Sequence, residues 1–180
     1  TKAVTIVEIM GRDSGWLTTA SAIGRVVNGV APDYVYLPER TFSMEQFFSD
    51  VRAALAKHPN VVIAVSEGVR FADGRYVCEG IGVESTDAFG HKQLSGTGKA
   101  LEYAVKNELG CKVRSIELNL PQRCAGHLLS ATDINEALAI GEAAVKCAAQ
   151  GVGGKMMTLV KHIHIQGFLT LLPHQRPHRW

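Results

Sequence analysis

Short apolar runs rich in β-branched residues alternate with stretches of helical periodicity, and this alternation restricts the fold more than any other feature. The runs with strand character are residues 4–10, 34–37, 61–65, 112–118 and 155–160. The stretches with helical character are residues 14–25, 43–58, 97–109 and 134–150. Strands that alternate with helices form parallel sheets covered on both faces. We therefore predict an α/β fold, a Rossmann-like parallel sheet with helices on both faces that includes all five runs.

Single residues indicate where several of the predicted helices begin or end. Ser14 is placed to cap the first helix, and Ser43 is placed to cap the second. Gly110 should close the third helix, and Asp133 or Thr132 should cap the last one. The first helix is expected to bury one apolar side, which consists of Trp16, Leu17, Ala20 and Ile23.

Composition favours a globular chain without a membrane span. The 180 residues are 46% hydrophobic and 20% charged, and no apolar run approaches the ~20 residues that a bilayer requires. The four cysteines are scattered without a C-x-x-C pair, which argues against a zinc site and favours the cytoplasm. The net charge is only +2, so we expect no nucleic-acid partner. The start resembles a chain entered in mid-strand, so we expect a segment of a longer protein.

Polar residues gather where the predicted strands end. Right-handed crossovers place the carboxyl ends of parallel strands at one edge, where open α/β sheets bind ligands. The candidate residues at this edge are Met10, Gly11, Arg12, Glu67, Arg114 and Arg123. Arginine offers a planar fork of donors that suits phosphate, and a carboxylate can accept hydrogen bonds from sugar hydroxyls. The set predicts a pocket for a phosphorylated polyol. Taken alone, an arginine after a strand is more often a solvated charge, and a glutamate there is more often a helix cap or an ion-pair partner.

Two nucleotide-binding motifs are missing. The sequence contains neither a complete P-loop nor a G-x-G-x-x-G after a strand, and Ser95–Lys99 is better interpreted as a helix start. Four of the seven histidines lie in the basic stretch 161–180. Because no acidic or cysteine partner accompanies them there, we predict no metal site.

Four stretches, in order, resemble the phosphofructokinase family. They are VEIMGRDSGWL at 7–17, APDYVYLPE at 31–39, VVIAVSEGV at 61–69 and the stretch from DAFGHKQL to the glycine at 151. The resemblance covers roughly residues 3–160. It is closest to the branch that includes pyrophosphate-dependent enzymes.

The resemblance implies transfer of a phosphoryl group from ATP or pyrophosphate, with Mg²⁺, to the 1-hydroxyl of fructose 6-phosphate in glycolysis. Met10, Gly11 and Arg12 would form the sugar-phosphate turn, with Arg12 also stabilising transition-state charge. Glu67 would hold sugar hydroxyls, and Arg114 and Arg123 would grip the 6-phosphate, Arg114 from a neighbouring subunit. The family also implies a cytoplasmic homo-oligomer, a dimer or tetramer with allosteric members, and neither nucleic acid nor membrane as partner.

Departures from the family pattern limit what this segment can do. The G-G-D-G-T donor loop and the T-x-D-N-D motif with the catalytic aspartate do not occur in the 180 residues. Ala3 and Asn119-Leu120 stand where many members have phosphate-binding side chains. We therefore expect a partial domain at 1–160 that lacks the donor-binding part, an unassigned basic tail at 161–180, and no activity from the segment alone. The alternative is an inactive regulatory or scaffold module of the same fold.

Overall fold

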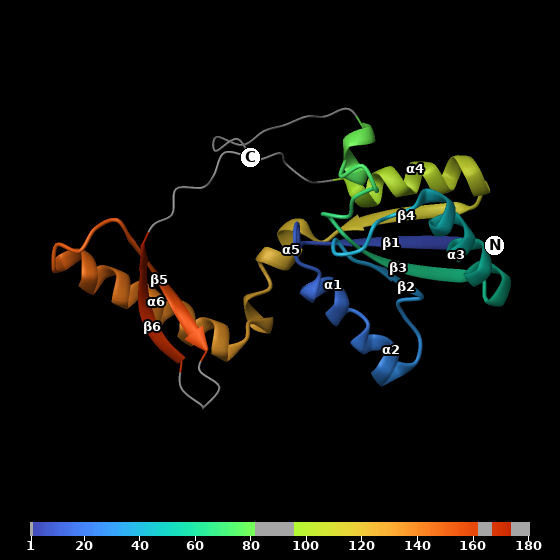
Figure 1. Ribbon diagram of the computed structural model, residues 1–180. Helices are drawn as coiled ribbons and strands as arrows, with labels where there is room; N and C mark the ends of the chain where they lie inside the picture. Colours follow the sequence, from blue (N-terminus) through green and yellow to red (C-terminus); the bar gives the residue numbers. More distant parts are fainter. Residues whose placement is uncertain (1, 82–95, 162–166, 174–180) are drawn as a thin grey trace. The chain divides into compact units, whose positions relative to one another are not determined.

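The computed structural model describes residues 2–81, 96–161 and 167–173. The chain divides into two compact units, Thr1–Cys124 and Ala125–Trp180 (Figure 1). The boundary falls inside the range 1–160 for which the sequence predicts one partial domain, and that domain assignment stays a prediction.

The first unit is built on a parallel sheet of four strands. They are β1 (Ala3–Ile9), β2 (Tyr34–Tyr36), β3 (Asn60–Ser66) and β4 (Lys112–Glu117). The strand order is β2-β3-β1-β4, and every neighbouring pair is parallel (Figure 1). Val4 lies opposite Val61 and Ile6 opposite Ile63, so matching apolar side chains share one face. The predicted α/β architecture is confirmed.

Helices α3 (Met44–Lys57) and α4 (Thr97–Leu109) supply the core on that face. Ser43 caps α3 by accepting a hydrogen bond from the Gln46 N–H, as predicted, and Gly110 closes α4. The buried side chains contributed by the two helices are Phe47, Val51, Ala54, Leu55, Leu101 and Val105. Helices α1 (Trp16–Ala20) and α2 (Ile23–Asn28) belong to the β1–β2 crossover, and the right-handed rule places them on the opposite face.

The first helix differs from the prediction. It begins at Trp16, and Ser14 does not cap it; the Gly15 N–H instead donates to Glu39 Oε1 at 2.7 Å. The predicted apolar side is exposed, with Trp16 at 82% and Ile23 at 60%, whereas Thr18 is buried. The predicted helix is divided into α1, of 5 residues, and α2, which begins at Ile23. Residues 16–23 therefore do not form one continuous apolar stripe.

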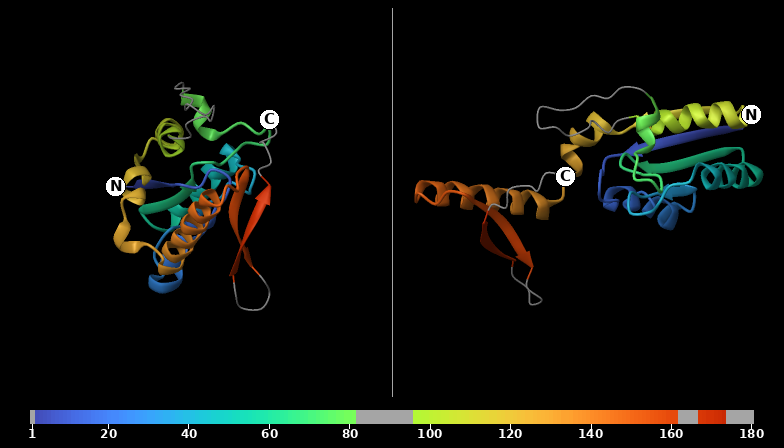
Figure 2. Two further views of the ribbon diagram at one scale, coloured as in Figure 1. Left: turned by 90° about the vertical axis from the view of Figure 1, so that its left-hand side faces the viewer. Right: turned by 45° about the horizontal axis from the view of Figure 1, so that its top comes forward.

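The second unit contains the last helix and a hairpin. Helix α6 (Ala131–Ala149) is capped by Ser130, so the predicted caps at Asp133 and Thr132 were wrong. Strand β5 (Lys155–Lys161) pairs antiparallel with β6 (Gly167–Pro173), forming a separate two-stranded sheet (Figure 2). The expectation that this run joins the parallel sheet was therefore wrong. An antiparallel partner needs only a short connection, whereas a parallel one needs a crossover. No recognisable strand pattern in the basic tail pointed to this partner.

Candidate functional site

The chain turns sharply where β1 ends, at residues 10–12, which we call the 10–12 turn. Gly11 has φ of +150°, and an added Cβ would lie 2.5 Å from the Ser14 carbonyl oxygen. The Gly11 N–H donates to Glu67 Oε1 at 3.2 Å, and the Ser66 hydroxyl donates to the Gly11 carbonyl. The turn after β1 is therefore fixed by Ser66, the last residue of β3, and by Glu67, which follows it.

The end of β3 packs directly against this turn. The Glu67 N–H donates to the Ile9 carbonyl oxygen at 3.1 Å. A Cβ at position 68 would lie 1.6 Å from the Arg12 carbonyl oxygen, so only glycine allows this approach. The Ser-Glu-Gly sequence at the end of β3 thus shapes the turn as well as supplying Glu67.

Helix α5 (Asn119–Arg123) closes the other side of the turn. The Met10 N–H donates to Gln122 Oε1 at 3.1 Å, and the Leu118 N–H donates to the Glu8 carbonyl oxygen at 2.9 Å. Sequence reasoning missed Gln122 as a contributor, although it stands beside the predicted Arg123. Its side-chain amide ties the helix that ends in Arg123 to the 10–12 turn.

The three candidate arginines differ in position. Arg12 is half-buried, whereas Arg114 and Arg123 are exposed. Arg114 lies opposite Thr5 in the middle of β4, so the expectation that it faces the carboxyl edge was wrong. The register explains this, because β4 begins beside Ala3 and Arg114 is only its third residue. Among the described residues, none of the three guanidinium groups has an ion-pair partner.

Neighbouring charges are already paired. Asp13 forms an ion pair with Arg70, whose guanidinium also lies over the Tyr76 ring at 4.3 Å. Because Arg70 neutralises Asp13, Arg12 remains available as a cation at the turn. The carboxyl edge thus combines one arginine that has no ion-pair partner in the described part of the chain, two structured strand ends and one carboxylate. This combination suits an anionic polyol.

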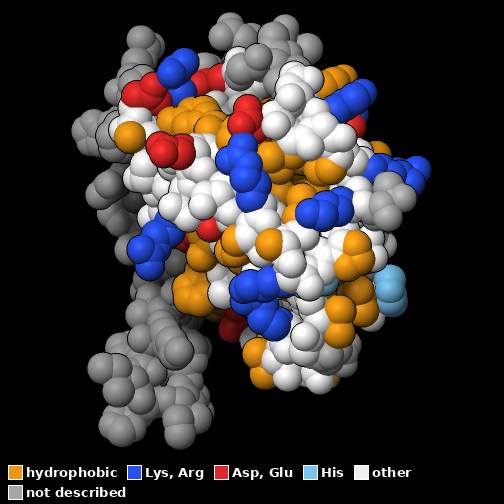
Figure 3. Space-filling model, turned by 90° about the vertical axis from the view of Figure 1, so that its right-hand side faces the viewer, with side chains coloured by type: hydrophobic (Ala, Val, Ile, Leu, Met, Phe, Trp, Pro, Cys, Tyr) orange, Lys and Arg blue, Asp and Glu red, His pale blue; other side chains and the backbone are white. Residues whose placement is uncertain are grey.

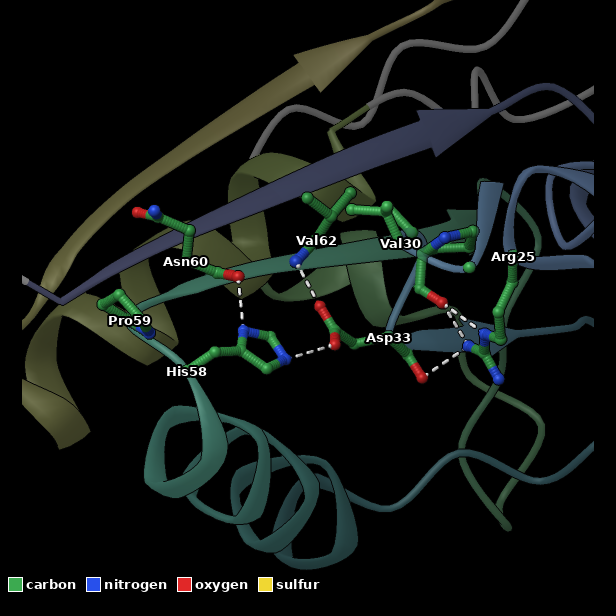
Figure 4. Close-up of a pocket in the computed structure, with 10 residues that line it drawn as sticks. Arg25, Val30, Asp33, His58, Pro59, Asn60 and Val62 are labelled. Atoms are coloured by element: carbon green, nitrogen blue, oxygen red, sulfur yellow. Dashed lines mark hydrogen bonds and ion pairs between the residues drawn. The ribbon is translucent and has the colours of Figure 1, made fainter. Parts of the chain in front are cut away.

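A second candidate lies where the strands begin. The hollow, of about 630 Å³, is lined by residues including Arg25, Asp33, His58 and Asn60 (Figure 4). His58 Nε2 lies 2.8 Å from Asp33 Oδ1, the Val62 N–H donates to Asp33 Oδ2, and Arg25 donates to the Asp33 carbonyl oxygen. These polar groups satisfy one another, which indicates a structural junction. On the surface at this end, Lys and Arg side chains are interspersed with acidic and apolar ones (Figure 3).

Two further features of the described residues concern metal-ligand clusters and membrane-spanning helices. These residues contain no cluster of three or more His, Cys, Asp or Glu side chains that could hold a metal. The four cysteines are free thiols, and no helix in the described part is long and apolar enough to cross a bilayer.

Comparison with known proteins gives concordant matches. A family model described as "Phosphofructokinase" matches residues 1–148. The pyrophosphate–fructose 6-phosphate 1-phosphotransferase of Halomonas elongata is 38% identical over 153 residues, which is 85% of this chain and 36% of that protein. A sulfofructose kinase of Alkalicoccus urumqiensis is 33% identical over 174 residues, 96% of this chain and 44% of that protein.

Solved structures agree with the sequence matches. The pyrophosphate-dependent phosphofructokinase of Nitrosospira multiformis superposes with a TM-score of 0.65 at 27% identity, covering 96% of this chain and 39% of that one. The chain therefore spans between 36% and 44% of the length of these three relatives.

Proposed function

The chain belongs to the phosphofructokinase family, and we propose that its 10–12 turn and Glu67 bind fructose 6-phosphate as the acceptor of a phosphoryl group. The observation that carries this proposal is the interlocked turn, in which the Gly11 N–H is bonded to Glu67. Beside it stands Arg12, which has no ion-pair partner within residues 2–81, 96–161 and 167–173. The substrate is that named for the Halomonas relative.

Each part of the turn has a chemical role in this proposal. Glu67 uses Oε1 to hold the Gly11 N–H, so its second oxygen can accept hydrogen bonds from sugar hydroxyls. Arg12 stays charged at all physiological pH values and stabilises negative charge that develops as the phosphoryl group moves. Phosphoryl transfer depends chiefly on positioning and electrostatic stabilisation, and this edge supplies both for the acceptor.

The 6-phosphate would be held by Arg123 and Arg114. Arg123 ends α5, which Gln122 ties to the turn. Arg114 is exposed in mid-strand, which suits a residue that reaches the site of a neighbouring copy. We therefore propose a homo-oligomer in which Arg114 of one subunit completes the site of another.

The phosphoryl donor and Mg²⁺ would be held by residues outside this segment. The described residues form no metal cluster, and the sequence lacks both donor-side motifs. The donor is pyrophosphate or ATP, since relatives of both kinds match. The complete enzyme would act in the cytoplasm, and this segment alone would bind acceptor without turnover. An inactive module of the same fold would bind the sugar phosphate but leave the complete protein without transferase activity.

Calorimetric titration of the protein with fructose 6-phosphate tests the acceptor site. Replacing Arg12 by alanine should weaken binding about a hundredfold, because a charged hydrogen-bond donor contributes about 1.5–3 kcal/mol. The matched control is Arg40→Ala, since Arg40 is exposed elsewhere in the same unit, and it should leave the affinity unchanged.

Unphosphorylated fructose and sulfofructose complete the titration series. Fructose should not bind measurably, because the arginines require an anionic substituent. Sulfofructose, the substrate named for the Alkalicoccus relative, should bind more weakly than the dianionic phosphate. Tighter binding of sulfofructose, or an Arg12→Ala variant with unchanged affinity, would contradict the proposed acceptor.

A further inference from the structure

Glu8 is buried two residues before the 10–12 turn. Its side chain is only 5% exposed, and it lies on the face of β1 that carries Val4 and Ile6. Glutamate is almost never fully buried unless it is paired. No Lys or Arg among the described residues pairs with Glu8, so its burial calls for another explanation.

The Glu8 side chain accepts a hydrogen bond from the first turn of helix α4. The Gly98 N–H donates to Glu8 Oε2 at 2.6 Å, in a buried contact between residues 90 positions apart. The residue before the helix, Gly96, has no side chain that could cap it, so a carboxyl group from β1 takes that role. A Cβ at position 98 would lie 3.3 Å from both Cβ and Oε2 of Glu8, so glycine permits this close docking.

The same turn of α4 is bonded to the end of β3. Thr97 is completely buried, and its hydroxyl donates to the Glu67 carbonyl oxygen at 2.9 Å. The Glu67 carboxylate in turn accepts from the Gly11 N–H at 3.2 Å. Contacts therefore run without interruption from Glu8 through α4 to Glu67 and the 10–12 turn.

We propose that Glu8 is a positioning residue of the sugar-phosphate site: through the first turn of α4 it holds Glu67 and the 10–12 turn in the arrangement that binds fructose 6-phosphate. This inference rests on the proposed function. Glu8 itself touches no reacting atom. It acts by docking the helix whose Thr97 fixes Glu67.

The charges around Glu8 make this docking sensitive to pH. The titratable groups that face it are Glu117 on β4, Glu67 after β3 and Cys78 in the short helix η1 (Val77–Ile81). Burial, followed by the charges of Glu117 and Glu67, raises the pKa of Glu8 to about 7. Burial also raises the pKa of the Cys78 thiol, so it remains neutral.

The direction of the pH effect follows from linkage. If the docking opens, Glu8 enters water and regains its ordinary pKa of 4.5. The open form therefore binds the proton less tightly and becomes more populated as the pH rises through 7. Docking should loosen above neutral pH, and affinity for fructose 6-phosphate should decline with it.

Titrating the full-length wild-type and Glu8→Gln proteins with fructose 6-phosphate between pH 6 and 8 tests the role. Glutamine keeps an acceptor for the Gly98 N–H but cannot ionise. The ratio of the wild-type Kd to the variant Kd should rise several-fold across this range. Titration of the sugar phosphate itself cancels in the ratio. Glu45→Gln, which alters an exposed carboxylate, should follow the wild-type profile.

Thr97→Val provides a second test if Glu8→Gln folds poorly. Valine keeps the shape but removes the hydroxyl that bonds to Glu67, so affinity should fall about fivefold at every pH. Parallel pH profiles for wild type and Glu8→Gln, or unchanged binding by Thr97→Val, would overturn the positioning role alone. A wild-type protein that binds no fructose 6-phosphate at any pH would overturn both the proposed function and the inference.

Discussion

Replacing Gly68 by alanine should lower the free energy of unfolding by more than about 3 kcal/mol. An added Cβ would lie 1.6 Å from the Arg12 carbonyl oxygen and 2.4 Å from its carbonyl carbon. Backbone atoms cannot rotate away as a side chain can, so the turn or the end of β3 must move. Because Arg12 would move with the turn, binding of fructose 6-phosphate should be lost as well. Urea denaturation followed by circular dichroism measures the stability.

Gly141→Ala is the matched control for this substitution. Gly141 lies within helix α6, and an added Cβ there meets nothing within 4 Å. Alanine should therefore be neutral or stabilise by about 0.5–1 kcal/mol through its higher helix propensity. A Gly68→Ala variant as stable as Gly141→Ala would show that Gly68 does not pack closely against the Arg12 backbone.

Glu8→Gln should stabilise the protein at pH 8 but not near pH 5. The pKa of Glu8 is raised from 4.5 to about 7, so the folded state holds the proton more tightly than the unfolded state. The stability that the neutral carboxyl contributes is complete below pH 4.5 and is lost as the pH rises through 7. A shift of this size corresponds to a pH-dependent difference of about 3 kcal/mol. Unfolding curves at both pH values measure it.

Glu45→Gln again serves as the control, and its effect should not differ between pH 5 and pH 8. If the stability of Glu8→Gln relative to wild type is the same at both pH values, burial does not raise the pKa of Glu8 in the folded protein. If the prediction is correct, the protein retains an acid that costs stability at neutral pH. Such costs are common where a residue is kept for function.

The parallel sheet was predictable because strand and helix periodicities alternate cleanly along the first 120 residues or so. Ser43 and Gly110 mark helix ends by local hydrogen bonding and backbone conformation, so their roles could also be predicted. The placement of Met10, Gly11, Arg12 and Glu67 followed from strand ends meeting at one edge. These predictions needed only local pattern and the right-handed crossover rule.

The remaining features depend on contacts that local pattern does not encode. Gln122 and Glu8 act through partners 112 and 90 positions away, and no periodicity marks them. The position of Arg114 depends on the register of β4 against β1. The basic tail lacks a recognisable period, so the partner of β5 was missed and β5 was assigned to the wrong sheet.

Hydrogen exchange with and without fructose 6-phosphate locates the acceptor site on the chain. Binding should slow exchange in peptides that cover residues 9–13 and 66–70, and Arg12→Ala should abolish this protection. Peptides that cover residues 25–33 and 58–62, which line the hollow at the amino ends of the strands, should be unaffected. Protection confined to that hollow, or absent from residues 9–13, would contradict a sugar-phosphate site at the 10–12 turn.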